Sequence, residues 1–381
     1  MSIAWFILIT CLLSMIQSFI FHKWGLVGLQ YNRFFNKKTV FAGEEIEMID
    51  EISNNKLLPL PWLRLESKID QNLQFARKQD NSTEELSEEF HRTLFSLLPY
   101  QKITRRHKVY CNKRGYYELK TVSLTLGDVL GFGETFDHFN AKATVTVYPE
   151  IIPIEDIPLP SHSWLGNIMV RRWIIDDPFV NAGVREYSYG DSMNSVNWKA
   201  TARTGSLQVS KRDYTSDHHL MIYLNFDETE DIWMPIQNAL LIEKGISYAA
   251  SIAQESISKG INTGFGCNSY LVEPFGEIIE NNVKESVRIE PKNGKHQLTQ
   301  LYDTMAKLSM DRSMSFKRFL LEDMNNRLNT DILIITTLLT ANIQENIRLL
   351  EVQGNKIEIL MLTDQLNDYK NMQGEGGYYA Q

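Results

Sequence analysis

Residues 331–336 read Asp-Ile-Leu-Ile-Ile-Thr, and this short apolar run decides the fold. Its length and branched side chains favour a strand buried on both faces, which is typical of parallel sheets covered by helices. Further strands are predicted at 219–226, 261–267, 269–272 and 356–362. Helical spacing of apolar residues predicts helices at 239–259, 297–308 and 341–352. The alternation predicts a parallel, doubly wound α/β domain over residues 215–364, followed by a polar, disordered tail at 365–381.

The segment upstream, residues 39–150, contains short runs in which apolar and polar residues alternate. Turn and breaker residues such as Asn54-Asn55 and Pro59-Leu60-Pro61 separate these runs. The predicted strands are 45–52, 63–67, 102–111, 116–126 and 143–148. Several short strands with regular turns predict a small Ig-like β-sandwich. The acidic stretch 72–89 is expected to form an exposed loop or a short helix.

The amino terminus predicts a membrane anchor over residues 1–24. Ile3–Phe21 (IAWFILITCLLSMIQSFIF) carries no charge, and about 20 apolar residues suffice for a helix to cross a bilayer. A cleaved signal peptide is disfavoured because no Lys or Arg precedes the run and no small-x-small cleavage site follows it. His22, Lys23, Arg33, Lys37 and Lys38 follow the helix. The positive-inside rule therefore predicts a single-pass cell-membrane protein with its bulk in the cytoplasm and residues 25–38 as a juxtamembrane segment.

Charge and cysteine content exclude some classes of protein. The 381 residues carry a formal net charge of −8, so no domain-wide basic field indicates a nucleic-acid partner. Cys11, Cys111 and Cys267 lack the spacing of a disulfide framework or a structural zinc site. The chain has no Gly-x-x-x-x-Gly-Lys-Ser/Thr loop and is therefore not itself a P-loop ATPase.

A polar and aromatic segment, residues 151–214, links the two predicted domains. It reads GVREYSYGD at 183–191 and VNWKATARTG at 196–205. The residues of interest are Arg185, Glu186, Tyr187, Gly190, Asp191, Trp198, Lys199, Arg203 and Gly205. Charges beside aromatic rings form either a buried ion network that fixes a loop or a docking surface anchored by Trp and Arg. The motif has no histidine and no nucleophile with an evident base, so catalysis is not indicated there.

The order of these motifs resembles a bacterial and archaeal family, domain of unknown function 58 (DUF58). Its hallmark is an REY…GD…(N/D)W…(A/S)AR.G.L pattern just before a von Willebrand A-like α/β domain. AGE at 42–44, LPLPWL at 58–63, RGY at 114–116 and GDVLG at 127–131 are also similar. The resemblance implies a membrane-associated protein, often encoded beside a MoxR-type AAA+ ATPase, that acts in the assembly or maturation of other complexes.

The same resemblance suggests where a metal ion would bind. Von Willebrand A-like domains that bind Mg²⁺ use Asp-x-Ser-x-Ser after the first strand, because this hard ion prefers oxygen ligands. The equivalent run here is Asp227-Glu228-Thr229-Glu230-Asp231. Asp227 and Thr229 match in chemistry, whereas Asp231 replaces a serine. The chain also has Thr337 where a further aspartate is expected. A degenerate Mg²⁺ site and a solvated acidic loop therefore remain alternatives.

Three functions remain open at this stage. The favoured one is a membrane-anchored, non-enzymatic adaptor or assembly factor that works with a MoxR-type AAA+ ATPase, because no complete catalytic constellation is present. The second is a metal-dependent enzyme that uses Asp227 and Asp231. The third is an envelope protein with a structural role.

Overall fold

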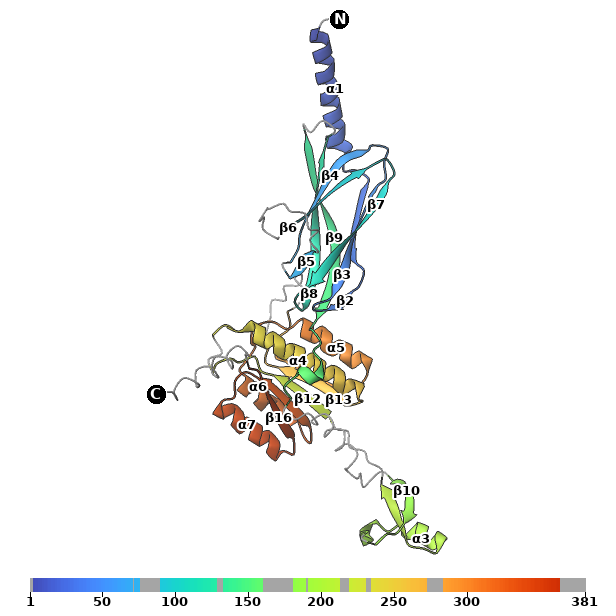
Figure 1. Cartoon of the computed structure of the whole chain (residues 1–381), viewed down its shortest axis with the longest axis vertical. Coiled ribbons are helices and arrows are strands. Elements are labelled where there is room, and N and C mark those ends of the chain that lie inside the picture. Colours follow the sequence, from blue (N-terminus) through green and yellow to red (C-terminus); the bar gives the residue numbers. More distant parts are fainter. Residues whose placement is uncertain are drawn as a thin grey trace, which may run out of the picture. The chain divides into compact units, whose positions relative to one another are not determined.

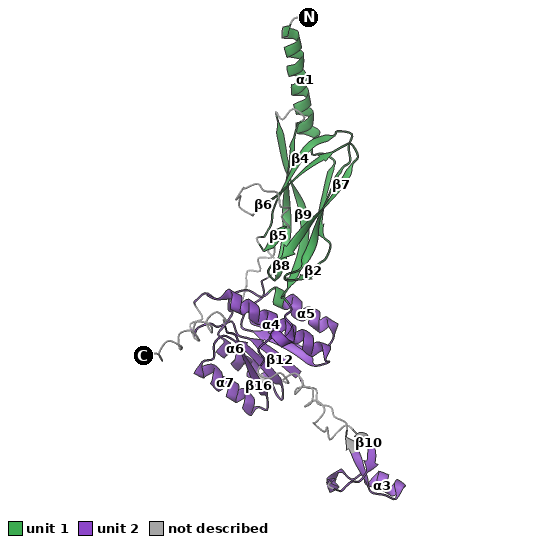
Figure 2. Cartoon of the chain, in the orientation of Figure 1, with its two compact units in different colours: residues 1–150, 273–279, 305–307 green, residues 151–272, 280–304, 308–381 purple. Residues whose placement is uncertain are grey.

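The chain forms two compact units (Figures 1 and 2). The computed structural model describes residues 3–70, 72–75, 90–128, 133–159, 181–189, 191–212, 219–230, 234–272 and 284–363. The first unit is built mainly from residues 1–150 and the second mainly from residues 151–381. The predicted tail at 365–381 and residues 76–89 of the acidic stretch lie outside the described residues. The start of that stretch is neither an exposed loop nor a helix, because Leu73–Phe75 form a strand and Leu73 is buried.

Helix α1 (Ile3–Trp24) begins the first unit. Its segment Trp5–Trp24 is long and apolar enough to cross a membrane, and most of its side chains are exposed. The last turn is different, because Phe21 is buried among sandwich residues. Lys56 donates hydrogen bonds to three carbonyls just beyond this turn, those of Trp24 (2.9 Å), Gly25 and Val27 (2.7 Å). An ammonium group thus satisfies carbonyls that the helix end leaves unpaired.

Two sheets form a β-sandwich, as the alternating runs predicted. One sheet has the order β1-β3-β7-β5 and the other the order β2-β9-β8-β4-β6. The strands are β1 (Leu29–Phe35), β2 (Thr39–Phe41), β3 (Glu45–Asn54), β4 (Leu60–Lys68), β5 (Leu73–Phe75), β6 (Phe90–Leu97), β7 (Lys102–Cys111), β8 (Gly115–Gly127) and β9 (Glu134–Tyr148). All pairings are antiparallel except that of β2 with β9. Two apolar clusters fill the interior, and both sheets contribute side chains to each cluster.

The structure corrects two expectations for this unit. Residues 25–38 do not form only a juxtamembrane segment, because they contain β1, which pairs with β3 from Leu29 to Phe35. Its buried face includes a charged residue, Arg33, so the strand lacks a continuous apolar pattern. Pro61 also lies inside β4 and not in a turn. The register of β4 against β6 shifts between Leu60 and Leu63, and such an irregularity accommodates a residue without an N–H donor.

The second unit contains a five-stranded sheet with helices on both faces. Its order is β14-β13-β12-β15-β16. The strands are β12 (His219–Leu224), β13 (Asn262–Cys267), β14 (Val287–Lys292), β15 (Asp331–Thr336) and β16 (Lys356–Met361). The helices are α4 (Ala239–Ser258), α5 (Lys295–Ala306), α6 (Phe316–Asp323) and α7 (Ala341–Val352), with short 3-10 turns η1 (Ile154–Asp156) and η3 (Met324–Asn326). Helices α4 and α5 cover one face, and α6 and α7 pack against the other (Figure 1).

The doubly wound arrangement agrees with the sequence, but the sheet is mixed and not wholly parallel. Strand β14 runs antiparallel to β13, whereas the other neighbours in the sheet are parallel. The predicted strand 269–272 is reduced to a single bridge between Leu271 and Leu308. Asp331–Thr336 and Ala341–Val352 form the strand and helix that were predicted, with the same bounds.

Candidate functional site

A small hairpin-and-helix module carries the signature motif. It consists of β10 (Asn181–Glu186), η2 (Met193–Ser195), α3 (Trp198–Thr204) and β11 (Gln208–Arg212), and β10 pairs antiparallel with β11. Asn197 caps α3 by accepting a hydrogen bond from the backbone of Ala200. Gly205 ends the helix with a φ of 72°, a conformation that favours glycine. The signature thus encodes the start and the end of α3.

An ion pair fixes the loop after β10. Both terminal nitrogens of Arg185 donate to the carboxylate of Asp191, each at 2.7 Å. The backbone N–H of Ser188 donates to the same carboxylate at 2.8 Å. Hydrogen bonds from Arg185 and then from Ser188 lower the pKa of Asp191 to about 2, so this carboxylate is ionised at neutral pH. The pair fixes the shape of the loop, but it is not the buried ion network that was expected, because the Arg185 side chain is 48% exposed.

Several large apolar side chains are exposed on the surface of the module. Trp198 is 65% exposed, Met193 is 60% exposed and Tyr189 is fully exposed. Lys199 and Arg203 are also exposed and lie one turn apart on α3. Among the described residues of the module, only Val196, Gln208 and Val209 are buried. A two-stranded hairpin with so small a core is marginally stable by itself, so this surface is suited to packing against something else.

The remaining signature residues have simpler roles. The backbone N–H of Tyr187 donates to Leu207 at 2.9 Å, and Glu186 pairs with Gln208 across the hairpin. Gly190 lies outside the described residues. The described part of the module brings no nucleophile and base together.

The predicted magnesium site lies at the carboxyl end of β12. Its aspartate, Asp227, accepts hydrogen bonds from other residues of the chain. Asp227 accepts a hydrogen bond from Asn268 Nδ2 at 2.8 Å on Oδ1 and from the backbone N–H of Phe316 at 2.8 Å on Oδ2. Buried Arg312 places Nη1 3.9 Å from Oδ1. Burial raises the pKa of Asp227, while the Phe316 N–H and Arg312 act in the opposite direction. The carboxylate thus fixes the start of α6.

These surroundings do not fit a magnesium site. Among the described residues, Asp227 belongs to no group of three converging His, Cys, Asp or Glu ligand atoms, and both of its oxygens already accept hydrogen bonds from the protein. Glu228 is used elsewhere, because its carboxylate accepts the backbone N–H groups of Gln237 and Asn238 before α4. Thr229 is exposed, and Asp231 lies outside the described residues.

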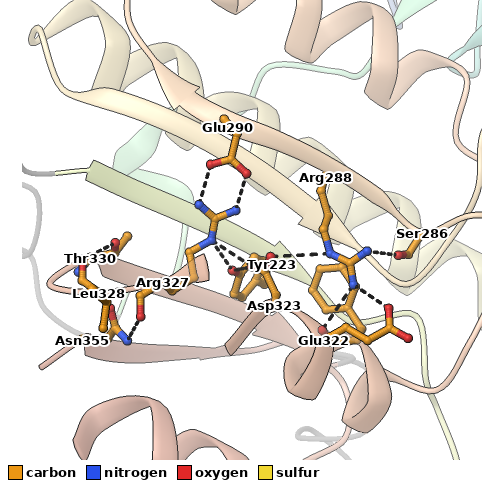
Figure 3. A network of polar contacts seen from close by, with 11 residues as sticks. Tyr223, Ser286, Arg288, Glu290, Glu322, Asp323, Arg327, Leu328, Thr330 and Asn355 are labelled. Atoms are coloured by element: carbon orange, nitrogen blue, oxygen red, sulfur yellow. Dashed lines mark hydrogen bonds and ion pairs between the residues drawn. The ribbon is translucent and has the colours of Figure 1, made fainter. Parts of the chain in front are cut away.

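A polar network that sequence patterns did not indicate lies on the face of the sheet that α6 covers (Figure 3). Arg327 donates to both carboxylate oxygens of Glu290, at 2.7 and 2.9 Å, and its Nε donates to Asp323 at 2.9 Å and to the Tyr223 hydroxyl at 3.1 Å. The Tyr223 hydroxyl also donates to Asp323. Arg288 Nε lies 3.6 Å from the same carboxylate. The network links β12, β14 and α6, and its burial indicates a structural role.

Comparison with known proteins gives limited guidance. No family model matches the chain. The chain is similar to an uncharacterized protein, YeaD, of Bacillus subtilis (strain 168), with 20% identity over 261 residues. That region covers 66% of this chain and 63% of the relative, so the chain spans less than two thirds of the relative's length.

Two solved structures to which the chain is similar each match less than a third of it. The CARDB domain of the PF1109 protein from Pyrococcus furiosus, in complex with di-metal ions, is 15% identical and covers 31% of this chain and 93% of that domain, with a TM-score of 0.21. The sixth cohesin of scaffoldin B from Acetivibrio cellulolyticus is 10% identical and covers 31% of this chain and 98% of the cohesin, with a TM-score of 0.22. TM-scores this low support no conclusion about function.

Proposed function

We propose that this protein is a membrane-anchored, non-enzymatic adaptor or assembly factor that acts with a MoxR-type AAA+ ATPase in the maturation of a protein complex. The observation that carries the proposal is the exposed aromatic and cationic surface of the signature module. Tryptophan, tyrosine and arginine are the residues that most often dominate the binding energy of protein interfaces. Trp198, Tyr189 and Arg203 are all exposed on this module.

The geometry of the module supports docking over a purely internal role. The Arg185–Asp191 ion pair and the caps of α3 fix the backbone, so the exposed anchors are preorganised and lose little conformational freedom on binding. A fixed backbone that presents exposed Trp198 is expected of a recognition surface. An internal network alone would leave this side chain without a function.

The order of the motifs supports membership of the DUF58 family and a von Willebrand A-like class for the second unit. In the mixed sheet, β12 is flanked by β13 and β15, and the acidic loop that begins at Asp227 follows the carboxyl end of β12. The engagement of Asp227 by Arg312 and Asn268 favours the adaptor over the metal-dependent enzyme.

The anchor supports a cell-membrane location with the folded units in the cytoplasm. Lys23 in the last turn of α1 and Lys37 and Lys38 beyond it are exposed, so they act as flanking positive charges. Arg33 does not contribute, because it is buried and paired with Asp50. If the folded units were instead digested by a protease added to intact cells, they would lie outside, and the structural envelope role would replace the adaptor.

The proposal is tested by affinity purification from detergent-solubilised membranes with a Trp198→Ala variant. The wild-type chain is expected to retain a AAA+ ATPase that the variant loses, because the main anchor is removed. Phe136→Ala is the matched control, since Phe136 is 73% exposed on β9 and belongs to the sandwich. Wild-type protein that recovers no ATPase, or a Trp198→Ala variant that recovers as much as the control, would refute the proposal.

A further inference from the structure

The β-sandwich contains a cluster of polar side chains in which Asp50 and Arg33 are buried and two histidines are half-exposed. Asp50 on β3, His107 on β7 and His91 on β6 each offer a ligand atom, and these atoms all lie within 4.8 Å of one another. Among the described residues, no other set of three His, Cys, Asp or Glu side chains meets in this way. Because β3 and β7 belong to one sheet and β6 to the other, the sandwich itself assembles the cluster.

Both imidazoles are held in place and available as ligands. His107 Nε2 is buried, lies 3.5 Å from Asp50 Oδ2 and makes no hydrogen bond. The ring of His91 stacks on Phe75 with a centroid separation of 4.3 Å, and Thr93 Oγ1 lies 3.0 Å from its Nε2. Burial lowers the pKa of both histidines, that of His91 to about 4. His107 Nε2 has no hydrogen-bond partner and can therefore offer its lone pair to an ion.

The carboxylate is oriented by its own partners. Tyr31 and the Nε of Arg33 both donate to Asp50 Oδ1 at 2.6 Å, whereas Oδ2 has a longer contact of 3.3 Å with Arg33 Nη2. Oδ2 is the oxygen nearer to His107. Such supporting hydrogen bonds are typical of the residues that position metal ligands.

We propose that Asp50, His91 and His107 form a binding site for a late first-row divalent metal ion, with Zn²⁺ as the reference ion and solvent as the fourth ligand. Two imidazoles and one carboxylate suit zinc, whereas Mg²⁺ and Ca²⁺ prefer all-oxygen sites. Asp50 already neutralises Arg33, so the charge of the ion must be offset by hydroxide or another anion on the side where the histidines are half-exposed. Zn–N bonds of about 2.0–2.1 Å would draw the rings inward and join β6 to β7.

The test uses full-length protein in detergent, without an affinity tag and treated with a chelator, titrated with Zn²⁺ and with Co²⁺. One equivalent of Zn²⁺ is expected to bind and raise the melting temperature of the sandwich, and Co²⁺ is expected to give a visible ligand-field band. His107→Gln and His91→Phe should each weaken binding by about tenfold or more. His138→Gln is the matched control, because His138 is an exposed histidine on β9 and should leave affinity unchanged.

Three results would overturn the site: no saturable binding to the wild type, binding that survives in the His91→Phe/His107→Gln double variant, or equal loss in His138→Gln. X-ray absorption of the zinc-loaded wild type provides a test that does not depend on the folding of the variants. Two imidazole nitrogens with oxygen ligands are expected. A coordination shell of oxygen alone, or one that contains sulfur, would contradict the assignment.

Discussion

Replacing Arg327 by methionine should destabilise the α/β domain because it leaves a buried carboxylate without its partner. The side chain of Arg327 is 4% exposed and that of Asp323 is 2% exposed, whereas that of Glu290 is 62% exposed. The contact with Asp323 should therefore dominate, since exposed ion pairs contribute only about 0–1 kcal/mol. Breaking a buried pair by removing one partner costs about 3–5 kcal/mol. Tyr223 and Arg288 also contact Asp323 and offset part of the loss, so we expect about 3 kcal/mol.

Amide hydrogen exchange in the central strands β12 and β15 measures the loss of stability of the α/β unit separately from that of the β-sandwich. A loss of about 3 kcal/mol should speed exchange through global opening by roughly 150-fold, because each 1.36 kcal/mol corresponds to about tenfold. Amides of β3 and β7 provide an internal reference, since these strands belong to the other unit. Their exchange rates should not change.

Arg318→Met is the matched control for Arg327→Met. Arg318 lies on α6 and pairs with Glu322 at 2.9 Å, but its side chain is 71% exposed. Its replacement should cost only about 0.3–0.5 kcal/mol. If the β12 amides of Arg327→Met exchanged no faster than those of Arg318→Met, the assignment of the network as a buried structural element would be refuted.

Three further predictions concern the site and the anchor. The pKa of the Asp191 carboxyl, measured by NMR, should be about 2. The contribution of its ion pair to hairpin stability is therefore present above the ordinary pKa of 3.8 and is lost as pH falls toward 2. Arg185→Gln should return the pKa of Asp191 toward 3.8. Lys56→Met should speed hydrogen exchange of the Gly25 amide, which donates to Phe21 at the end of α1, by about tenfold or more. The reason is that hydrogen bonds to charged groups contribute about 1.5–3 kcal/mol. An unchanged exchange rate would contradict the capping role of Lys56. Millimolar Mg²⁺ should not raise the melting temperature, and a rise that Asp227→Asn abolishes would restore the magnesium site.

The sequence predicted those elements in which apolar residues recur regularly on the buried face. Asp331–Thr336 and Ala341–Val352 were found with the bounds that the structure has, because their apolar residues recur at strand and helix spacing. Strand β14 and helix α6 were missed because Arg288, Glu290 and Asp323 interrupt the apolar pattern. Their charges are satisfied by partners distant in the sequence, and the spacing of residues cannot show such pairing.

Candidate sites made by residues close in the sequence could also be predicted, whereas those made by distant residues could not. Arg185 and Asp191 are six residues apart, so their interaction could be predicted as a local ion network. The exposure of Trp198 was left open, because the same motif was compatible with a buried cluster. His91 and His107 lie in different sheets of the sandwich. Strand pairing brings His107 beside Asp50 and the packing of the two sheets brings His91 to both, so no short motif could have indicated that cluster.

Photocrosslinking from position 198 tests the central claim most directly. A photoreactive phenylalanine analogue in place of Trp198 would be activated in living cells, and the same analogue in place of Phe136 would serve as the reference. The adaptor account predicts a crosslink to a AAA+ ATPase from position 198 and none from position 136. Crosslinks from position 198 that join only parts of this same chain would show that the exposed surface packs internally, and they would contradict the account.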